Sequence, residues 1–185
     1  MTAWEEALKF TLGYEGGYAN SPWDAGGETF RGISRRFWGS WEGWVLVDQI
    51  RAAAPTDFRT VLLQDQTLLQ EAMNFYRRNF WDQINGDALP HNYAIAAFDM
   101  AVHSGVQTAV RILQYSVKAH VDGVVGPRTV QACLDAGEPG LITYLAARAK
   151  LLHEIMVNRD DQKVWAMNWF KRLFKLADIV LENEA

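Results

Sequence analysis

The chain has 185 residues, 49% hydrophobic and 22% charged, which is enough to bury a sizeable core and excludes extended disorder. Its formal net charge is −4. Residues 1–90 carry 8 basic and 12 acidic side chains and residues 91–185 carry 10 of each, so neither half has the positive field of a nucleic-acid binder. No apolar run is as long as a membrane span, which argues against stable membrane insertion.

The first half of the chain predicts helices that flank a glycine-rich segment. Residues 2–14 carry apolar side chains at helical spacing, and two glycines follow to end that helix. Residues 18–33 are rich in glycine and carry Thr, Phe and Ile, which allows a small hairpin. Residues 34–41 (SRRFWGSW) predict a short helix, and residues 55–81 are helical after Pro55 with room for one break.

The second half of the chain is predicted to be almost wholly helical. Residues 92–105 (NYAIAAFDMAVHSG) are apolar on most faces, which is typical of a central buried helix. Residues 122–129 (DGVVGPRT) form a turn that places Pro127 at the first position of a new helix. Further helices are expected at 106–119, 128–136, 138–157 and 161–180. The expected fold is therefore mainly α, with at most a small β-hairpin near residues 18–33.

Two carboxylates in residues 14–34 (YEGGYANSPWDAGGETFRGIS) form the main candidate site. Glu15 ends the first helix on its apolar stripe, where partial burial and the negative end of the helix dipole both disfavour its charged form. Such a carboxyl group suits a general acid. Asp24 lies on a polar turn that keeps it ionised, and Thr29 can hold a water. The pair suits glycoside hydrolysis, but the spacing fits equally a polar helix cap at Glu15 and an Asx-turn at Asp24.

The segment EGGYANSPWDAGGETFRGIS at residues 15–34 resembles the signature of the glycoside hydrolase family 108 lysozymes, which are N-acetylmuramidases. In that family a Glu-Gly-Gly-Tyr motif carries the catalytic Glu and is followed by Asp, Gly-Gly, Thr and Gly-Ile. The order of Glu, Asp and Thr also resembles the catalytic triad of phage-type lysozymes. This sequence matches the family signature at Glu15, Gly16, Gly17, Tyr18, Asn20, Asp24, Gly26, Gly27, Thr29, Gly32 and Ile33.

Residues 79–90, 94–114 and 122–129 are similar to the peptidoglycan domain that accompanies this family. His103 departs from it, because the family usually has Asn there. The resemblance implies a lysozyme-like, two-lobed helical fold, with a catalytic lobe at 1–90 and a peptidoglycan-domain-like lobe at 91–185 packed against it. A separate glycan-binding module is the alternative for the second half, and the short interval between the halves favours a second lobe.

The resemblance implies cleavage of the β-1,4 bond between N-acetylmuramic acid and N-acetylglucosamine, with Glu15 as the general acid. Asp24 and Thr29 would position the attacking water, although Asp24 could instead stabilise the transition state or shape the turn. Three alternatives remain open at this stage: a lytic transglycosylase, a hydrolase of another N-acetylated polymer such as chitin, and a non-catalytic peptidoglycan-binding or secretion-accessory protein.

Tyr18, Asn20 and Trp23 flank the acids and are the candidate substrate-binding residues, because aromatic faces pack on sugar rings and an amide can bind an N-acetyl group. The four histidines have no metal-ligand spacing, so we expect no metal and no cofactor. The basic cluster Arg31, Arg35 and Arg36 could meet the carboxylates of peptidoglycan stem peptides, but a solvated helix face is the favoured interpretation. The single cysteine, Cys133, is interpreted as a small buried hydrophobe.

The first ten residues, MTAWEEALKF, lack the basic and apolar regions of a signal peptide. We therefore expect synthesis in the cytoplasm and action on the cell wall, in the periplasm, after release by a separate route such as the holin used by phage endolysins. The expected partners are peptidoglycan glycan strands, and the expected state is a monomer. The sequence leaves phage and bacterial origins open.

Overall fold

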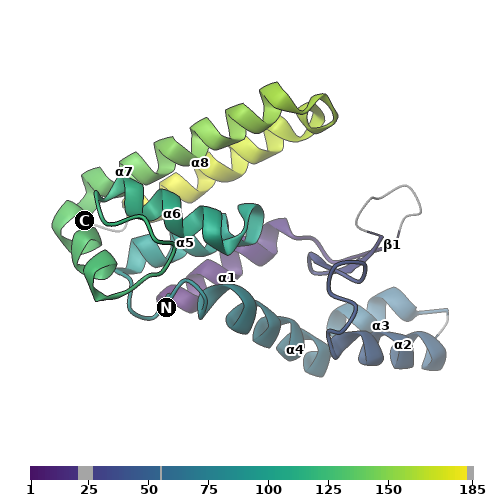
Figure 1. Cartoon of the computed structure of the whole chain (residues 1–185). Helices are drawn as coiled ribbons and strands as arrows, with labels where there is room; N and C mark the ends of the chain where they lie inside the picture. Colours follow the sequence, from purple (N-terminus) through teal and green to yellow (C-terminus); the bar gives the residue numbers. More distant parts are fainter. Residues whose placement is uncertain (21–26, 55, 183–185) are drawn as a thin grey trace. The chain divides into compact units, whose positions relative to one another are not determined.

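The computed structural model describes residues 1–20, 27–54 and 56–182, and it divides into two compact units (Figure 1). We call Thr11–Asn79 the sheet unit, and Met1–Phe10 together with Phe80–Ala185 the helical unit. The first helix, α1 (Ala3–Tyr14), begins in the helical unit and ends in the sheet unit. The predicted lobe boundary at residue 90 stays a prediction.

A small antiparallel sheet follows α1 in the sheet unit. Its strands pair in the order β1-β2-β3, and three helices come after it along the chain. The elements are β1 (Tyr18–Asn20), β2 (Glu28–Phe30), β3 (Ile33–Ser34), α2 (Gly43–Ala53), α3 (Phe58–Gln64) and α4 (Gln66–Tyr76). The break predicted within residues 55–81 lies at Asp65, whose carboxylate accepts a hydrogen bond of 2.7 Å from the backbone N–H of Leu68 and so caps α4.

The turn between β2 and β3 consists of only two residues, Arg31 and Gly32, with φ angles of 48° and 82°. Two successive positive φ angles are the geometry of a type I′ hairpin turn, which matches the twist of the flanking strands. The turn brings the buried side chains of Phe30 and Ile33 into register. A third strand therefore extends the hairpin that the sequence predicted.

The helix predicted at residues 34–41 is wrong. The backbone N–H of Arg35 donates to the carbonyl of Glu28 at 2.8 Å, so the chain leaves Ser34 still paired with the sheet. The ring of Trp41 then stacks on Phe30 with centroids 6.1 Å apart, and this packing holds the segment as turns until α2 begins at Gly43. Tertiary packing of aromatic side chains outweighs local helix propensity here.

The helical unit is built around α5 (His91–Ser104), whose residues from Tyr93 to Ala101 are all buried. This confirms the predicted central helix. Trp4 of α1 and Trp81 pack edge-on against each other and against Phe98 of α5, with ring centroids 5.3–5.7 Å apart. The other elements of the unit include α6 (Val106–Ser116), α7 (Pro127–Asn158), a 3₁₀ segment (Asp160–Trp165) and α8 (Ala166–Glu182). A π-helical turn (Arg77–Trp81) leads from the sheet unit into the helical unit.

The helix α7 has a kink at Gly137, where φ is 53° and ψ is −148°, and Pro139 follows two residues later. The two helices predicted at 128–136 and 138–157 are therefore the two parts of α7. Its second part runs beside α8 as a long helical hairpin (Figure 1). Among the described helices, none has both the length and the hydropathy that crossing a bilayer requires.

A buried ion cluster joins three helices of this unit. Asp99 of α5 is fully buried and binds Arg148 of α7 and Arg172 of α8, each at 2.7 Å. Burial alone would raise the pKa of Asp99, but the two guanidinium groups outweigh it and hold that pKa below its ordinary value. One turn further along α5, burial and the same two arginines lower the pKa of His103 to about 4.

Candidate active site

Glu15 immediately follows the last residue of α1 and is half-buried. Its backbone N–H donates to the carbonyl of Thr11 at 3.3 Å, so Glu15 continues the last turn of the helix. Gly16 then takes a φ of 73°, the left-handed conformation that commonly ends helices. The predicted position of Glu15 at the end of an apolar helix is therefore the observed one.

The carboxyl group of Glu15 lies against the turn between β2 and β3. A Cβ atom placed on Gly32 would come within 2.5 Å of Oε2 of Glu15 and 2.8 Å of the Tyr76 hydroxyl. The Tyr76 hydroxyl in turn donates to the carbonyl of Arg31 at 2.6 Å. The end of α1, the hairpin turn and the end of α4 thus converge on one carboxyl group, with a phenol hydroxyl beside it.

Tyr18 and Asn20 lie on β1 and help to line a surface pocket of about 480 Å³. The ring of Tyr18 packs edge-on against Phe58 with centroids 5.1 Å apart. Arg51 lies over Phe58 with its guanidinium carbon 5.0 Å from the ring centroid, and Arg59 lies 5.7 Å over Tyr18. Two aromatic rings and two guanidinium groups therefore surround this pocket, which we call the Arg59 pocket.

An ion network adjoins the Arg59 pocket and shares Arg51 with it. Arg51 binds Glu28 and contacts Asp48 at 3.0 Å, while Arg35 binds the same two carboxylates at 3.0 and 2.5 Å. The hydrogen bond from Arg35 lowers the pKa of Asp48. Burial and the hydrogen bond that its hydroxyl donates to Glu28 raise the pKa of Tyr18. The interpretation of Arg35 as part of a solvated helix face is wrong, because it lies outside any helix and is ion-paired.

Thr29 lies on β2, opposite Ala19 of β1. Side chains alternate between the two faces of a strand, and directly paired residues share a face. Tyr18 and Asn20 pair with Phe30 and Glu28, so the sheet puts Thr29 on the other face from both of them. The predicted residues Trp23 and Asp24 lie outside the described part of the chain.

Comparison with protein-family models identifies two consecutive regions of the chain. Residues 8–105 match the model of glycosyl hydrolase 108, which is more than half of the chain. The chain belongs to glycosyl hydrolase family 108. Residues 107–174 match a model described as a predicted peptidoglycan domain. Together, the matches support a glycoside hydrolase that acts on peptidoglycan, and they confirm the family resemblance read from the sequence.

A solved structure, that of SagA from Brucella abortus, is similar to this family 108 chain over almost its whole length. The TM-score is 0.72 at 26% sequence identity, over 97% of this chain and 94% of the SagA chain. The mainly α, lysozyme-like fold class is confirmed. No match was found among curated proteins.

Three residues around the family motif were not predicted as site residues: Tyr76, Arg51 and Arg59. Tyr76 lies in an aromatic run, NFYRRNFW, whose pattern indicates only a packed helix face. It reaches the Arg31 carbonyl across a separation of 45 residues. Its position beside Glu15 depends on how α4 packs, which neither spacing nor composition reveals.

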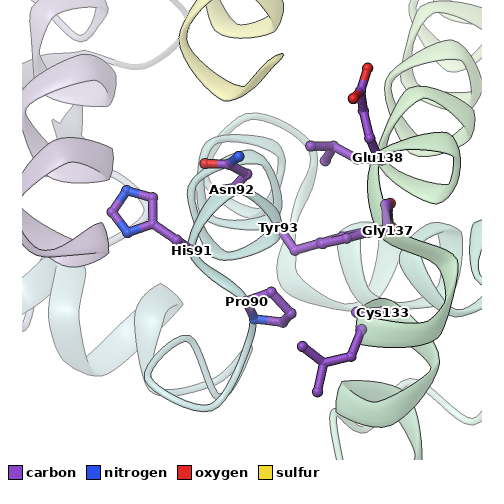
Figure 2. Close-up of a pocket in the computed structure, with 9 residues that line it drawn as sticks. Pro90, His91, Asn92, Tyr93, Cys133, Gly137 and Glu138 are labelled. Atoms are coloured by element: carbon purple, nitrogen blue, oxygen red, sulfur yellow. Dashed lines mark hydrogen bonds between the residues drawn. The ribbon is translucent and has the colours of Figure 1, made fainter. Parts of the chain in front are cut away.

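The helical unit of this family 108 protein contains a pocket of about 490 Å³ between the start of α5 and the kink in α7 (Figure 2). The side chain of Tyr93 points across the pocket toward Gly137, and its hydroxyl donates a hydrogen bond of 2.6 Å to the backbone carbonyl of Gly137. Burial raises the pKa of Cys133 to about 12, so its thiol stays protonated and is not a nucleophile. Within the described ranges, no group of three or more His, Cys, Asp or Glu side chains is placed to hold a metal ion.

Proposed function

We propose that this family 108 hydrolase is an N-acetylmuramidase that cleaves the β-1,4 bond between N-acetylmuramic acid and N-acetylglucosamine, with Glu15 as its general acid. The observation that carries the proposal is the convergence of α1, the β2–β3 turn and α4 on the Glu15 carboxyl group. A carboxyl group fixed in one position by rigid elements is what proton donation to a glycosidic oxygen requires.

In the proposed reaction, Glu15 gives its proton to the glycosidic oxygen while the bond from that oxygen to the anomeric carbon breaks. Positive charge develops on the sugar ring in an oxocarbenium-like transition state. Water then adds its oxygen to the anomeric carbon and loses a proton to a carboxylate. If the 6-hydroxyl of the muramic acid attacks instead, the product is an anhydro sugar and the enzyme is a lytic transglycosylase.

We assign Thr29 to positioning the attacking water, together with Asp24. The β2 strand fixes Thr29 between its partners Ala19 and Ser34, and a hydroxyl on a paired strand is a suitable hydrogen-bond partner for water. A Thr29→Val variant keeps the size of the side chain and removes its hydroxyl. It is expected to lower kcat with a small change in KM.

The test is mass spectrometry of purified peptidoglycan digested by the wild type and by Glu15→Gln. The control is Glu42→Gln, which removes an exposed carboxylate from the same unit, at a helix start where its side chain makes no capping hydrogen bond. Reducing muramic acid ends from the wild type and the control, and none from Glu15→Gln, support the proposal. Anhydro-muramic acid ends from the wild type would instead identify the enzyme as a lytic transglycosylase. No product from the wild type would overturn the enzymatic proposal and favour a wall-binding protein.

We also propose that the enzyme acts at the cell wall as an endolysin-type protein. This proposal is supported by the second family model, which is described as a predicted peptidoglycan domain, because peptidoglycan is the polymer of the bacterial cell wall. Purified protein added to cells with a permeabilised outer envelope should lower their turbidity, whereas Glu15→Gln should not.

A further inference from the structure

We infer that the Arg59 pocket is a subsite for a carboxylate carried by the glycan strand, on the sheet unit that holds Glu15. The inference rests on the proposed function, because it assumes that the strand occupies this unit. In the described part of the chain, its lining residues come from β1, α2 and the start of α3: Tyr18, Asn20, Arg51, Phe58 and Arg59.

The aromatic rings hold both guanidinium groups in defined orientations. Arg51 lies over Phe58 and Arg59 lies over Tyr18, and the two rings pack against each other. A guanidinium group stacked on a ring keeps its N–H edge available for a planar, bidentate carboxylate. Because the rings already restrict the side chains, less conformational entropy is lost when an anion binds.

Of the two arginines that line the pocket, Arg59 is the one available to bind an anion. The positive charge of Arg51 is neutralised by its ion pairs with Glu28 and Asp48. Arg59 is exposed and donates one hydrogen bond, of 2.8 Å, to the backbone carbonyl of Tyr18. In the described part of the chain it has no carboxylate partner. The pocket therefore keeps a net positive group beside an amide, Asn20, in a chain whose formal net charge is −4.

The chemistry of the strand decides what such a pocket recognises. N-acetylglucosamine carries no charge, whereas muramic acid carries a lactyl group that ends either in a free carboxylate or in a stem peptide with its own carboxylates. Tyr18 follows Glu15 by three residues, which span at most about 11 Å. The subsite would therefore lie on the same unit as Glu15, on the face of the sheet opposite Thr29, and it would select strands that carry muramic acid over chitin-like strands.

The test measures equilibrium binding of three tetrasaccharides to full-length Glu15→Gln protein, which is expected to bind without turnover. The probes are a chitotetraose, a peptide-free alternating strand with free lactyl carboxylates, and the same strand carrying stem peptides. Arg59→Gln is added to this background. Arg78→Gln is the control, because Arg78 is an exposed arginine of the same unit that lies outside the Arg59 pocket. Arg59→Lys keeps the charge and removes the planar fork.

We expect Arg59→Gln to weaken binding of a carboxylate-bearing strand by about threefold to fivefold, as for an exposed ion pair, and to leave chitotetraose unchanged. The loss should shrink at high salt, and Arg59→Lys should restore part of the affinity. A loss with the peptide-free strand identifies the lactyl carboxylate, and a loss only with the peptide-bearing strand identifies the stem.

Two results would overturn the inference: equal losses on all three probes, or no loss on any. Binding is measured without turnover, so this result does not depend on the digestion experiment. If the wild type releases no product but Arg59→Gln still weakens binding selectively, the proposed reaction fails and the subsite stands. If the wild type releases muramic acid ends but Arg59→Gln changes nothing, the reaction stands and the subsite fails.

Discussion

Glu15 and Gly32 lie so close together that a methyl group on Gly32 would come within 2.5 Å of the Glu15 Oε2 atom and 2.9 Å of its Cβ atom. Non-bonded atoms do not approach that closely, so a side chain at Gly32 must displace the carboxyl group, the turn or both. Gly32 also has a φ of 82°, which any L-residue adopts only with strain. The glycine of the family motif is thus required both for the turn and for the position of the acid.

The first prediction is that Gly32→Ala abolishes peptidoglycan cleavage and destabilises the sheet unit more than a comparable change elsewhere. The comparison is Gly16→Ala, because Gly16 has a similar φ of 73° but open space where its Cβ would be. We expect Gly16→Ala to cost about 1 kcal/mol from strain alone. Denaturant unfolding and initial rates measure both variants. Equal losses of stability and activity in the two would contradict a direct role for the contact with Glu15.

The second prediction concerns the Tyr76 hydroxyl, which donates to the carbonyl of Arg31 at 2.6 Å beside the Glu15 carboxyl group. Tyr76→Phe should lower kcat several-fold and destabilise the protein by about 1 kcal/mol, the usual net value of one hydrogen bond.

The matched control for Tyr76→Phe is Tyr93→Phe, which removes another tyrosine–carbonyl bond of 2.6 Å, to Gly137 in the helical unit. We expect Tyr93→Phe to show a similar loss of stability and an unchanged kcat. A kcat that falls equally in both variants would mean that Tyr76 acts only through folding.

The sequence predicted features of the fold that depend on neighbouring residues, and it did not predict features that depend on contacts between distant segments. The end of α1 at Glu15 depends on neighbouring residues and was predicted from apolar spacing and the two glycines that follow, and the two helices predicted at 128–136 and 138–157 meet where α7 has its kink. Residues 34–41 were predicted wrongly, because Trp41 packs on Phe30 and strand pairing reaches Ser34, and neither interaction is visible in a local pattern.

The candidate site divides in the same way. Glu15 was singled out by its motif, but the neighbours that position it, Gly32 and Tyr76, were not paired with it, because Tyr76 is 61 residues away along the chain. The basic residues of the Arg59 pocket were missed because α2 and α3 bring them to β1 only in the folded unit. Motifs indicate which groups can react, whereas packing determines which groups hold and surround them.

The third prediction is that Asp99→Ala destabilises the helical unit by about 3–5 kcal/mol, because it leaves Arg148 and Arg172 buried without their shared carboxylate. The control is Asp178→Ala, which removes an exposed carboxylate that pairs with Lys175 at 3.4 Å on α8. Exposed pairs contribute little, so this control should stay within about 1 kcal/mol of the wild type. Chemical denaturation measures both, and a small loss for Asp99→Ala would mean that water replaces the carboxylate.

The fourth prediction is a loss of stability between pH 6.5 and pH 4 that depends on His103. Burial, with Arg148 and Arg172 nearby, lowers the pKa of His103 from 6.5 to about 4 in the folded protein. Below pH 6.5 the unfolded chain therefore binds a proton that the folded protein does not, and stability falls as the pH falls toward 4, by roughly 3 kcal/mol in total. Asp99, whose pKa is also lowered, adds to the loss only at the acid end of this range, where the unfolded chain begins to protonate its carboxyl groups.

His103→Asn removes this titration and installs the residue that the family usually has at that place. Melting temperatures measured from pH 7 to pH 4.5 should fall less steeply in His103→Asn than in the wild type. The control is His153→Asn, an exposed histidine on α7, which should follow the wild-type curve. Both variants lose one histidine, and of the two only the half-buried His103 lies near two guanidinium groups. Parallel curves for all three proteins would therefore show that His103 is protonated equally in the folded and unfolded states.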